Sequence, residues 1–156
     1  MLVARALLPI ITVMATAADA PQVNMKAEEL IHGRRAAYYL SGALVSEMQY
    51  SVGHGGDPTR EVFAANAIAN WARVLPSMFP PGTDVPPTHA NPNVWTDRPG
   101  FEAKAGAYAN AATRLAEVAA TGDKDAFMAQ LSATRAACDA CHHVYHRQEE
   151  PSDGKK

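Results

Sequence analysis

The sequence predicts an all-α protein, an antiparallel four-helix bundle. Alanine is abundant, isoleucine and valine are sparse, and aromatic residues make up only 7% of the chain. This composition favours helices, because Ala has the highest helix propensity whereas β-branched and aromatic residues fill strands. Four stretches with helical periodicity, joined by short first and third connections, then describe a bundle. The length of 156 residues suits one domain.

The charge balance argues against a nucleic-acid partner. The chain carries 14 Lys and Arg against 16 Asp and Glu, a formal net charge of −2, whereas nucleic-acid binding asks for a strong basic excess. Apolar residues make up 47% and charged residues 19% of the chain, which is a globular rather than a disordered composition. The sequence therefore predicts a small, acidic domain with no nucleic-acid partner.

The first 20 residues predict a secretory signal peptide. A short basic start precedes the uncharged apolar run Leu7–Thr16, and two small-x-small cleavage sites follow, ending at Ala17 and Ala20. The apolar run is too short to span a membrane. An apolar N-terminal helix or a membrane anchor is the open alternative. We expect a signal peptide over residues 1–20 and an exported, soluble domain over residues 21–156, with no membrane partner after cleavage.

Periodicity predicts the first two helices. Residues Lys26 to about Ser51 contain no proline and place Ile31, Tyr38 and Val45 on one helical row. Three glycines then break the pattern, and Asp57-Pro58 is typical of a helix N-terminus. The second helix is expected from about Thr59 to Leu75, with one apolar stripe of Val62, Ala65, Ala69 and Ala72.

An irregular stretch separates the second and third helices. It begins at Pro76 and contains most of the prolines of the chain, too many for a helix or a central strand. At roughly twenty residues it is longer than most loops, so we expect it to pack across the bundle.

Capping signals define the last two helices. The third is expected to begin at Thr96-Asp97-Arg98-Pro99, with a capping oxygen and a proline in the first turn, and to run to Ala120. Thr121-Gly122-Asp123 predicts a tight junction, because it supplies a glycine C-cap and then an aspartate N-cap. The fourth helix is expected to fade near Glu150 and carries three inward-facing residues towards the cysteines: Phe127, Leu131 and Thr134.

One motif near the C-terminus carries the chemistry. Cys138-Asp139-Ala140-Cys141-His142 is a Cys-x-x-Cys-His sequence, the attachment signature of c-type haem. On a helix, offsets of three and four residues rotate by about −60° and +40°, so Cys138, Cys141 and His142 share one face. Two thioethers to the haem vinyl groups and one imidazole to the iron can therefore come from the same side.

Two other interpretations of the cysteines stay open. A thioredoxin-like dithiol would need a strand-turn-helix context, whereas the motif lies inside a predicted helix. A zinc site could draw on a cluster of close residues, although structural zinc sites usually take ligands from two separated segments. The members of that cluster are Cys138, Cys141, His142, His143 and His146. Either alternative predicts a colourless protein.

A Cys-x-x-Cys-His on the last helix of an exported four-helix chain resembles cytochrome c′, the class II c-type cytochromes. The resemblance covers nearly all of Lys26–Arg147, and three further segments match: Arg34-x-x-x-Tyr38, Asn93-Val94-Trp95-Thr96-Asp97, and Phe101–Leu131 with its Gly122-Asp123 junction. It implies a four-helix bundle that holds one covalently attached haem c near the C-terminal helix, in the periplasm.

The resemblance also implies individual roles around the haem. Cys138 and Cys141 would attach it and His142 would be the proximal iron ligand. Tyr38 matches the first-helix side chain that blocks the other axial side, with Tyr39 and Ile31 as alternatives. The first-helix arginine that pairs with a haem propionate is matched by one of two neighbours, Arg34 or Arg35, and a solvated arginine is the alternative for Arg34.

The chain departs from the family near the proximal histidine. Four residues after that histidine the family usually has arginine, whereas this chain has His146 followed by Arg147. A histidine there would make the proximal electrostatics depend on pH around neutrality. Whether His146 replaces the arginine functionally is left open, and His143 is expected at the surface.

The resemblance implies a high-spin, five-coordinate iron that binds nitric oxide or carbon monoxide, with nitric oxide trapping and electron transfer to a redox partner protein as roles. The rival is a low-spin electron carrier with a methionine ligand from the first helix. On a helical wheel Met25 and Met48 lie about 140° and 80° from Tyr38, so neither is expected to reach the iron. The resemblance also implies a homodimer formed by the first two helices. We expect no enzyme, since no second acid–base pair accompanies the motif; a peroxidase-like or redox enzyme is the open alternative.

Overall fold

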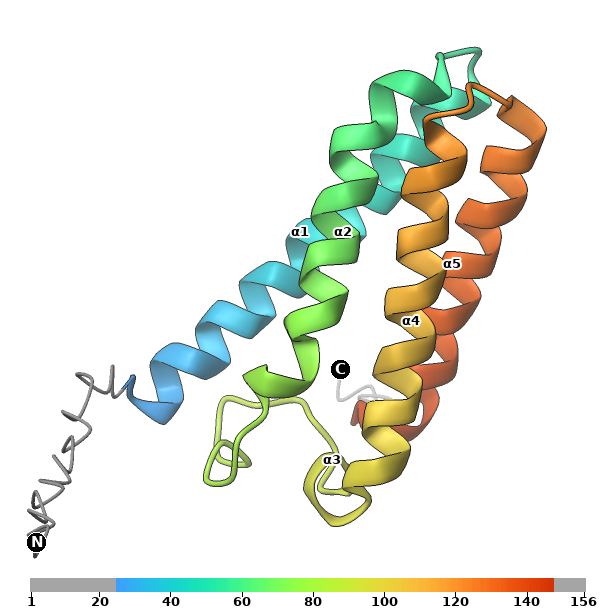
Figure 1. The fold of residues 1–156 in the computed structure, drawn as a ribbon. Coiled ribbons are helices and arrows are strands. Elements are labelled where there is room, and N and C mark those ends of the chain that lie inside the picture. The colour runs from blue at the N-terminus through green and yellow to red at the C-terminus, as the bar shows by residue number, and fades with distance from the viewer. Residues whose placement is uncertain (1–24, 148–156) are drawn as a thin grey trace, which may run out of the picture.

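The computed structural model describes residues 25–147 and confirms the predicted all-α fold. Four long helices form the bundle (Figure 1): α1 (Ala27–Gly53), α2 (Val62–Val74), α4 (Arg98–Ala119) and α5 (Lys124–Tyr145). The predicted signal peptide lies outside the described residues. None of the helices between residues 25 and 147 is long and apolar enough to cross a membrane.

Three shorter helical segments flank the long helices. A 3₁₀ turn over Pro58–Glu61 leads into α2, and a second one over Leu75–Met78 extends its end. The irregular stretch contains the short helix α3 (Asn93–Thr96), which the sequence did not predict, because a four-residue helix is too short to show periodicity.

The predicted helix caps are confirmed. The Asp97 carboxylate accepts a hydrogen bond from the Gly100 amide at 3.2 Å, and Pro99 lies in the first turn of α4. The Asp123 carboxylate accepts from the Ala126 amide at 2.9 Å and starts α5. Gly122 between α4 and α5 has φ +73°, a left-handed conformation that favours glycine.

The fourth helix ends earlier than the sequence suggested. It stops at Tyr145, and His146 is already extended, with φ −107° and ψ 136°. His146 pairs with Ala90 in an isolated β-bridge, and the Asn91 amide donates to the Tyr145 carbonyl at 2.9 Å. The expected end near Glu150 was therefore wrong, because backbone bonds to a loop more than 50 residues away replace the helical ones.

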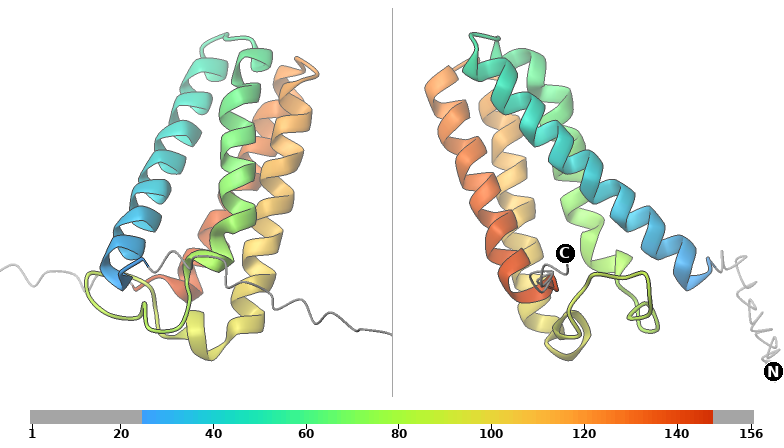
Figure 2. Two further views of the ribbon diagram at one scale, coloured as in Figure 1. Left: turned by 60° about the vertical axis from the view of Figure 1, so that its left-hand side comes forward. Right: turned by 180° about the vertical axis from the view of Figure 1, so that it is seen from behind.

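The core lies between α2, α4, α5 and the C-terminal half of α1, while α1 tilts away from α4 and α5 towards its N-terminal end (Figure 2). Most residues of the predicted stripes are buried: Ile31 and Val45 of α1, Ala65, Ala69 and Ala72 of α2, and Phe127, Leu131 and Thr134 of α5. Tyr38 and Val62 are only half-buried, and α1 also buries Arg34, Met48 and Val52.

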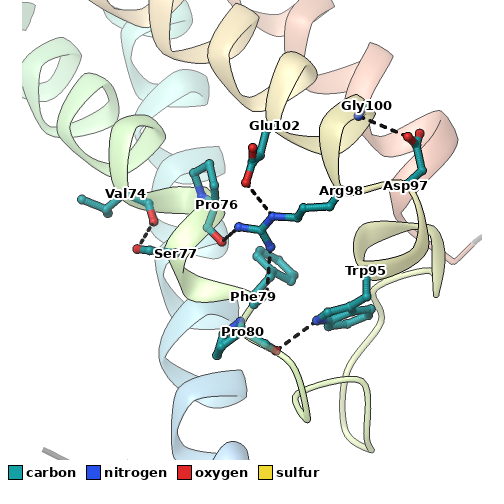
Figure 3. A network of polar contacts seen from close by, with 10 residues as sticks. All are labelled: Val74, Pro76, Ser77, Phe79, Pro80, Trp95, Asp97, Arg98, Gly100 and Glu102. Carbon is teal, nitrogen blue, oxygen red and sulfur yellow. Dashed lines mark hydrogen bonds and ion pairs between the residues drawn. The ribbon is translucent and has the colours of Figure 1, made fainter. Parts of the chain in front are cut away.

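The proline-rich segment, residues 79–92, packs across the end of the bundle where α1 diverges from α4 and α5, as expected (Figure 2). Arg98 at the start of α4 donates to the Phe79 carbonyl at 2.9 Å and to the Pro76 carbonyl at 2.8 Å, and Trp95 Nε1 donates to the Pro80 carbonyl at 3.0 Å (Figure 3). These side-chain hydrogen bonds give the irregular segment partners outside regular secondary structure, which holds it in place.

Two glycines of α4 should respond oppositely to alanine. A Cβ at Gly106 would meet nothing within 4 Å, so Gly106→Ala is expected to raise the free energy of unfolding by about 0.5–1 kcal/mol through chain entropy. A Cβ at Gly100 would collide with the Asp97 carboxylate and the Tyr145 hydroxyl, so Gly100→Ala is expected to lower it. Urea denaturation of both variants checks this, and equal shifts in one direction would contradict it.

Candidate haem-binding site

A cavity of about 460 Å³ opens between α1, α4 and α5, above the proline-rich segment. We call it the central cavity. Both cysteines of the motif, His142, Tyr38 and the two neighbouring arginines of α1 border it. Apolar side chains complete its wall, one from α1 and the rest from other segments: Val45, Leu75, Phe79, Ala90, Val94, Phe101 and Ala105. The structure thus brings together the residues that the sequence singled out from the first and last helices.

The motif lies on the last turns of α5, as the spacing predicts. Cys138 and Cys141 are half-buried free thiols, and His142 keeps exposed surface. Burial raises the pKa of Cys138 to about 11 and also raises that of Cys141, so both remain neutral thiols at neutral pH. Burial, and to a lesser degree nearby His146, lowers the pKa of His142, which favours the neutral imidazole that binds iron.

Tyr38 faces His142 across the central cavity. Their ring centroids are 6.2 Å apart, and burial raises the pKa of Tyr38 well above its usual value, which keeps the phenol neutral. Of the two alternatives for this position, Tyr39 borders the cavity but is 70% exposed, while Ile31 is buried elsewhere in the core. Tyr38 is therefore the candidate that packs opposite the histidine.

Arg34 is buried, with only 2% of its surface exposed, so the solvated alternative is wrong. Nη1 donates to Thr83 Oγ1 at 2.9 Å and to the Met78 carbonyl at 3.1 Å, while Nη2 donates to the Thr83 carbonyl at 2.9 Å and to Thr88 Oγ1 at 2.7 Å. The guanidinium carbon lies 4.1 Å from the centre of the Phe79 ring. Arg34 thus holds the proline-rich segment against α1 while it borders the cavity.

Arg35 makes fewer hydrogen bonds than Arg34. It is half-buried, borders the central cavity and donates one hydrogen bond, from Nη1 to the Pro87 carbonyl at 3.2 Å. Both candidate propionate partners therefore lie at the same wall of the cavity. Both terminal nitrogens of Arg34 donate to residues of the loop, whereas only one Arg35 nitrogen donates a hydrogen bond.

The central cavity has a cationic border. Arg34, Arg35 and Arg135 line it, together with three histidines, whereas Asp139 is the one carboxylate among its lining residues. The ion pairs of residues 25–147 involve none of these arginines. An apolar chamber with cations at its edge suits a flat apolar group that carries carboxylates, so the residues present fit a haem with its propionates.

His146 lies beside the motif although it is not on α5. Its ring centroid is 5.6 Å from that of His142 and 6.0 Å from that of His89. The sequence placed His146 near His142 by helical spacing, and the structure places it there by the bridge to Ala90. His143 is exposed and lies outside the cavity lining, as expected.

The other interpretations of the motif find little support. Within residues 25–147 no three His, Cys, Asp or Glu side chains are arranged to hold a metal ion, which argues against the zinc site. The two cysteines lie within one continuous helix, which is not the context of a thioredoxin-like dithiol.

Two aromatic residues at or next to the cavity were not predicted from the sequence. Trp71 of α2 packs edge to face on Tyr38, with ring centroids 5.4 Å apart and an interplanar angle of 88°. Tyr145 borders the cavity, packs on Phe101 and donates to the Asp97 carboxylate at 2.7 Å. Both are aromatic residues near predicted buried stripes, which was the available signal.

Comparison with known proteins identifies relatives over most of the chain. A family model described as Cytochrome C′ matches residues 29–146. The cytochrome c′ of Rhodocyclus tenuis is 33% identical over 136 residues, which cover 80% of this chain and 98% of that protein. The cytochrome c′ of Rhodospirillum rubrum is 38% identical over 86 residues, which cover 54% of this chain and 58% of that protein.

Solved structures share the fold. A cytochrome c′ with a ligand-controlled dimer dissociation has a TM-score of 0.76 at 29% identity and covers 81% of this chain and 100% of its own. A nitric oxide complex and a carbon monoxide-bound form of cytochrome c prime variants from Alcaligenes xylosoxidans each have a TM-score of 0.72 at 25% identity, covering 79% of this chain and 98% of theirs. On the family match, the shared bundle and a cavity bordered by the Cys-x-x-Cys-His motif, the chain belongs to the cytochrome c′ family, whose cofactor is a covalently attached haem c.

Proposed function

We propose that the protein binds small gaseous ligands, nitric oxide or carbon monoxide, at a five-coordinate haem iron. The observation that carries the proposal is the position of Tyr38, which borders the central cavity and faces the His142 ring, with ring centroids 6.2 Å apart. On the side of the haem opposite His142, a side chain that does not ligate the iron would leave a position that only a small molecule can enter.

In this proposal each residue has a defined task. Cys138 and Cys141 form the thioethers, His142 binds the iron through a neutral imidazole, and Arg34 or Arg35 pairs with a propionate. The bound haem iron supplies one open coordination position for a diatomic gas. Tyr38 excludes water from that position, and its raised pKa keeps it a neutral phenol rather than the phenolate that ligates iron in some haem proteins.

The low-spin alternative lacks its methionine ligand within the described residues. Met48 is fully buried in the core and Met25 is half exposed, and neither borders the central cavity. No other methionine among residues 25–147 lines it either. This arrangement supports the five-coordinate iron and leaves electron transfer as a secondary role.

The relatives support the choice of ligand. Cytochrome c prime variants of the same fold have been solved with nitric oxide and with carbon monoxide bound. We propose nitric oxide trapping in the periplasm as the role, by binding rather than by turnover of an organic substrate.

A homodimer through α1 and α2 is part of the proposal. One relative shows a ligand-controlled dimer dissociation, and α1 and α2 carry exposed apolar residues: Tyr39, Leu40 and Phe63.

Removing the Tyr38 ring tests whether this side chain restricts the entry of gas to the iron. Tyr38→Ala is expected to raise the association rate of carbon monoxide with the reduced protein on the order of tenfold, because in the wild type the ring must leave its edge-to-face contact with Trp71, worth about 0.5–1.5 kcal/mol, before the gas can enter. Flash photolysis measures this rate.

Tyr38→Phe is the matched control, since it keeps the ring and loses only the hydroxyl. Its rate is expected to stay within about twofold of the wild type. An unchanged rate in Tyr38→Ala, or equal acceleration in both variants, would contradict the assignment of Tyr38 as the side chain that restricts access.

A further inference from the structure

Trp71 lies behind Tyr38 as seen from the central cavity. Tyr38 borders the cavity and Trp71 does not, yet the two rings meet edge to face at 5.4 Å. We propose that Trp71 is a positioning residue that limits how far Tyr38 can withdraw from the iron side and thereby sets the rate of gas entry. This inference rests on the proposed function.

Tyr38 is enclosed on two sides. Its ring centroid lies 6.2 Å from that of His142 and 5.4 Å from that of Trp71, and both distances are those of direct ring contacts. A flat group that enters between Tyr38 and His142 must therefore displace one of these rings. If Tyr38 yields, Trp71 is the side chain that stops it.

Trp71 carries a buried indole N–H in an apolar environment. Its Nε1–H is fully buried and has no hydrogen-bond partner within residues 25–147. An unpaired buried donor destabilises the fold, and phenylalanine or leucine would fill a purely structural position without that cost. Edge-to-face contact adds an attraction that an aliphatic side chain lacks.

The experiment compares two variants of the holoprotein by carbon monoxide association after flash photolysis. Trp71→Leu removes the ring and is expected to raise the rate roughly threefold to tenfold. Trp71→Phe keeps an aromatic edge and is expected to restore most of the wild-type rate. Trp95→Phe is the control, because the Trp95 indole donates to the Pro80 carbonyl and the ring packs on Phe79 rather than on Tyr38.

A second measurement reports on the contact itself. In the reduced carbonyl form, the two indole N–H signals are separated by nuclear magnetic resonance and assigned with Trp95→Phe. Tyr38→Leu is expected to shift the Trp71 signal and to leave that of Trp95 in place, because the ring current of Tyr38 acts on its neighbour alone.

The outcomes separate this inference from the proposed function. Acceleration in Trp71→Leu, rescue by phenylalanine and a Trp71 signal that follows Tyr38 support it. Equal rates in the wild type and Trp71→Leu, or acceleration in Trp95→Phe to the same extent, overturn it while gas binding stands. A wild type that binds no carbon monoxide overturns both.

Discussion

Replacing Arg34 with alanine is expected to lower the free energy of unfolding by about 4–5 kcal/mol. Each hydrogen bond to a charged donor contributes about 1.5–3 kcal/mol, and the contributions add incompletely. Arg34 makes four of them to Met78, Thr83 and Thr88, all from a side chain with 2% exposure. Alanine would remove these four bonds, leaving Thr88 Oγ1 with only the Ala90 amide as donor, and would leave a hole against the Phe79 ring.

Urea denaturation followed by circular dichroism measures this loss. Arg35→Ala is the matched control, since the neighbouring side chain is half-buried and makes a single bond to the Pro87 carbonyl. We expect it to cost about 1 kcal/mol. Arg34→Lys should recover only part of the loss, because an ammonium cannot reproduce the planar fork of donors. Equal losses for Arg34→Ala and Arg35→Ala would show that Arg34 does not anchor the segment.

Replacing Cys138 and Cys141 together with alanine is expected to abolish covalent haem attachment. A thioether requires a thiol, and the two thiols that border the central cavity are those of the motif. The measurement is haem retention by the exported protein after denaturation and acid–acetone extraction. The wild type is expected to keep its colour through extraction and the double variant to lose it completely.

Histidine variants complete the comparison. His142→Ala should keep covalent haem and change the optical spectrum, because it removes the iron ligand and not the thiols. His143→Ala, one residue along α5 and outside the cavity lining, should resemble the wild type in both respects. Covalent haem in the double cysteine variant, or the same spectrum for both histidine variants, would show that the motif is not used as proposed.

Local signals predicted the elements that depend on local chemistry. The Cys-x-x-Cys-His spacing predicts a shared helix face from rotation per residue alone, and α5 has it. Asp97 and Asp123 predict caps because a carboxylate accepts from an amide two or three residues ahead, and both do. These features need no knowledge of distant parts of the chain.

Features that depend on distant segments could not be predicted from the sequence. Arg34 has partners 44 to 54 residues away, in a segment without periodicity, so its burial had no local signal. The end of α5 at Tyr145 depends on the bridge between His146 and Ala90. The Trp71 contact with Tyr38 depends on how α2 crosses α1. Tertiary packing decides all three.

The optical spectrum of the exported protein tests the central claim most directly. It should be recorded in the oxidised and reduced states and again in the reduced state with carbon monoxide or nitric oxide. A five-coordinate iron guarded by Tyr38 predicts a broad high-spin Soret band that sharpens when gas is added. Sharp α and β bands that gas does not move would contradict the claim, because they would require a sixth ligand where Tyr38 faces His142.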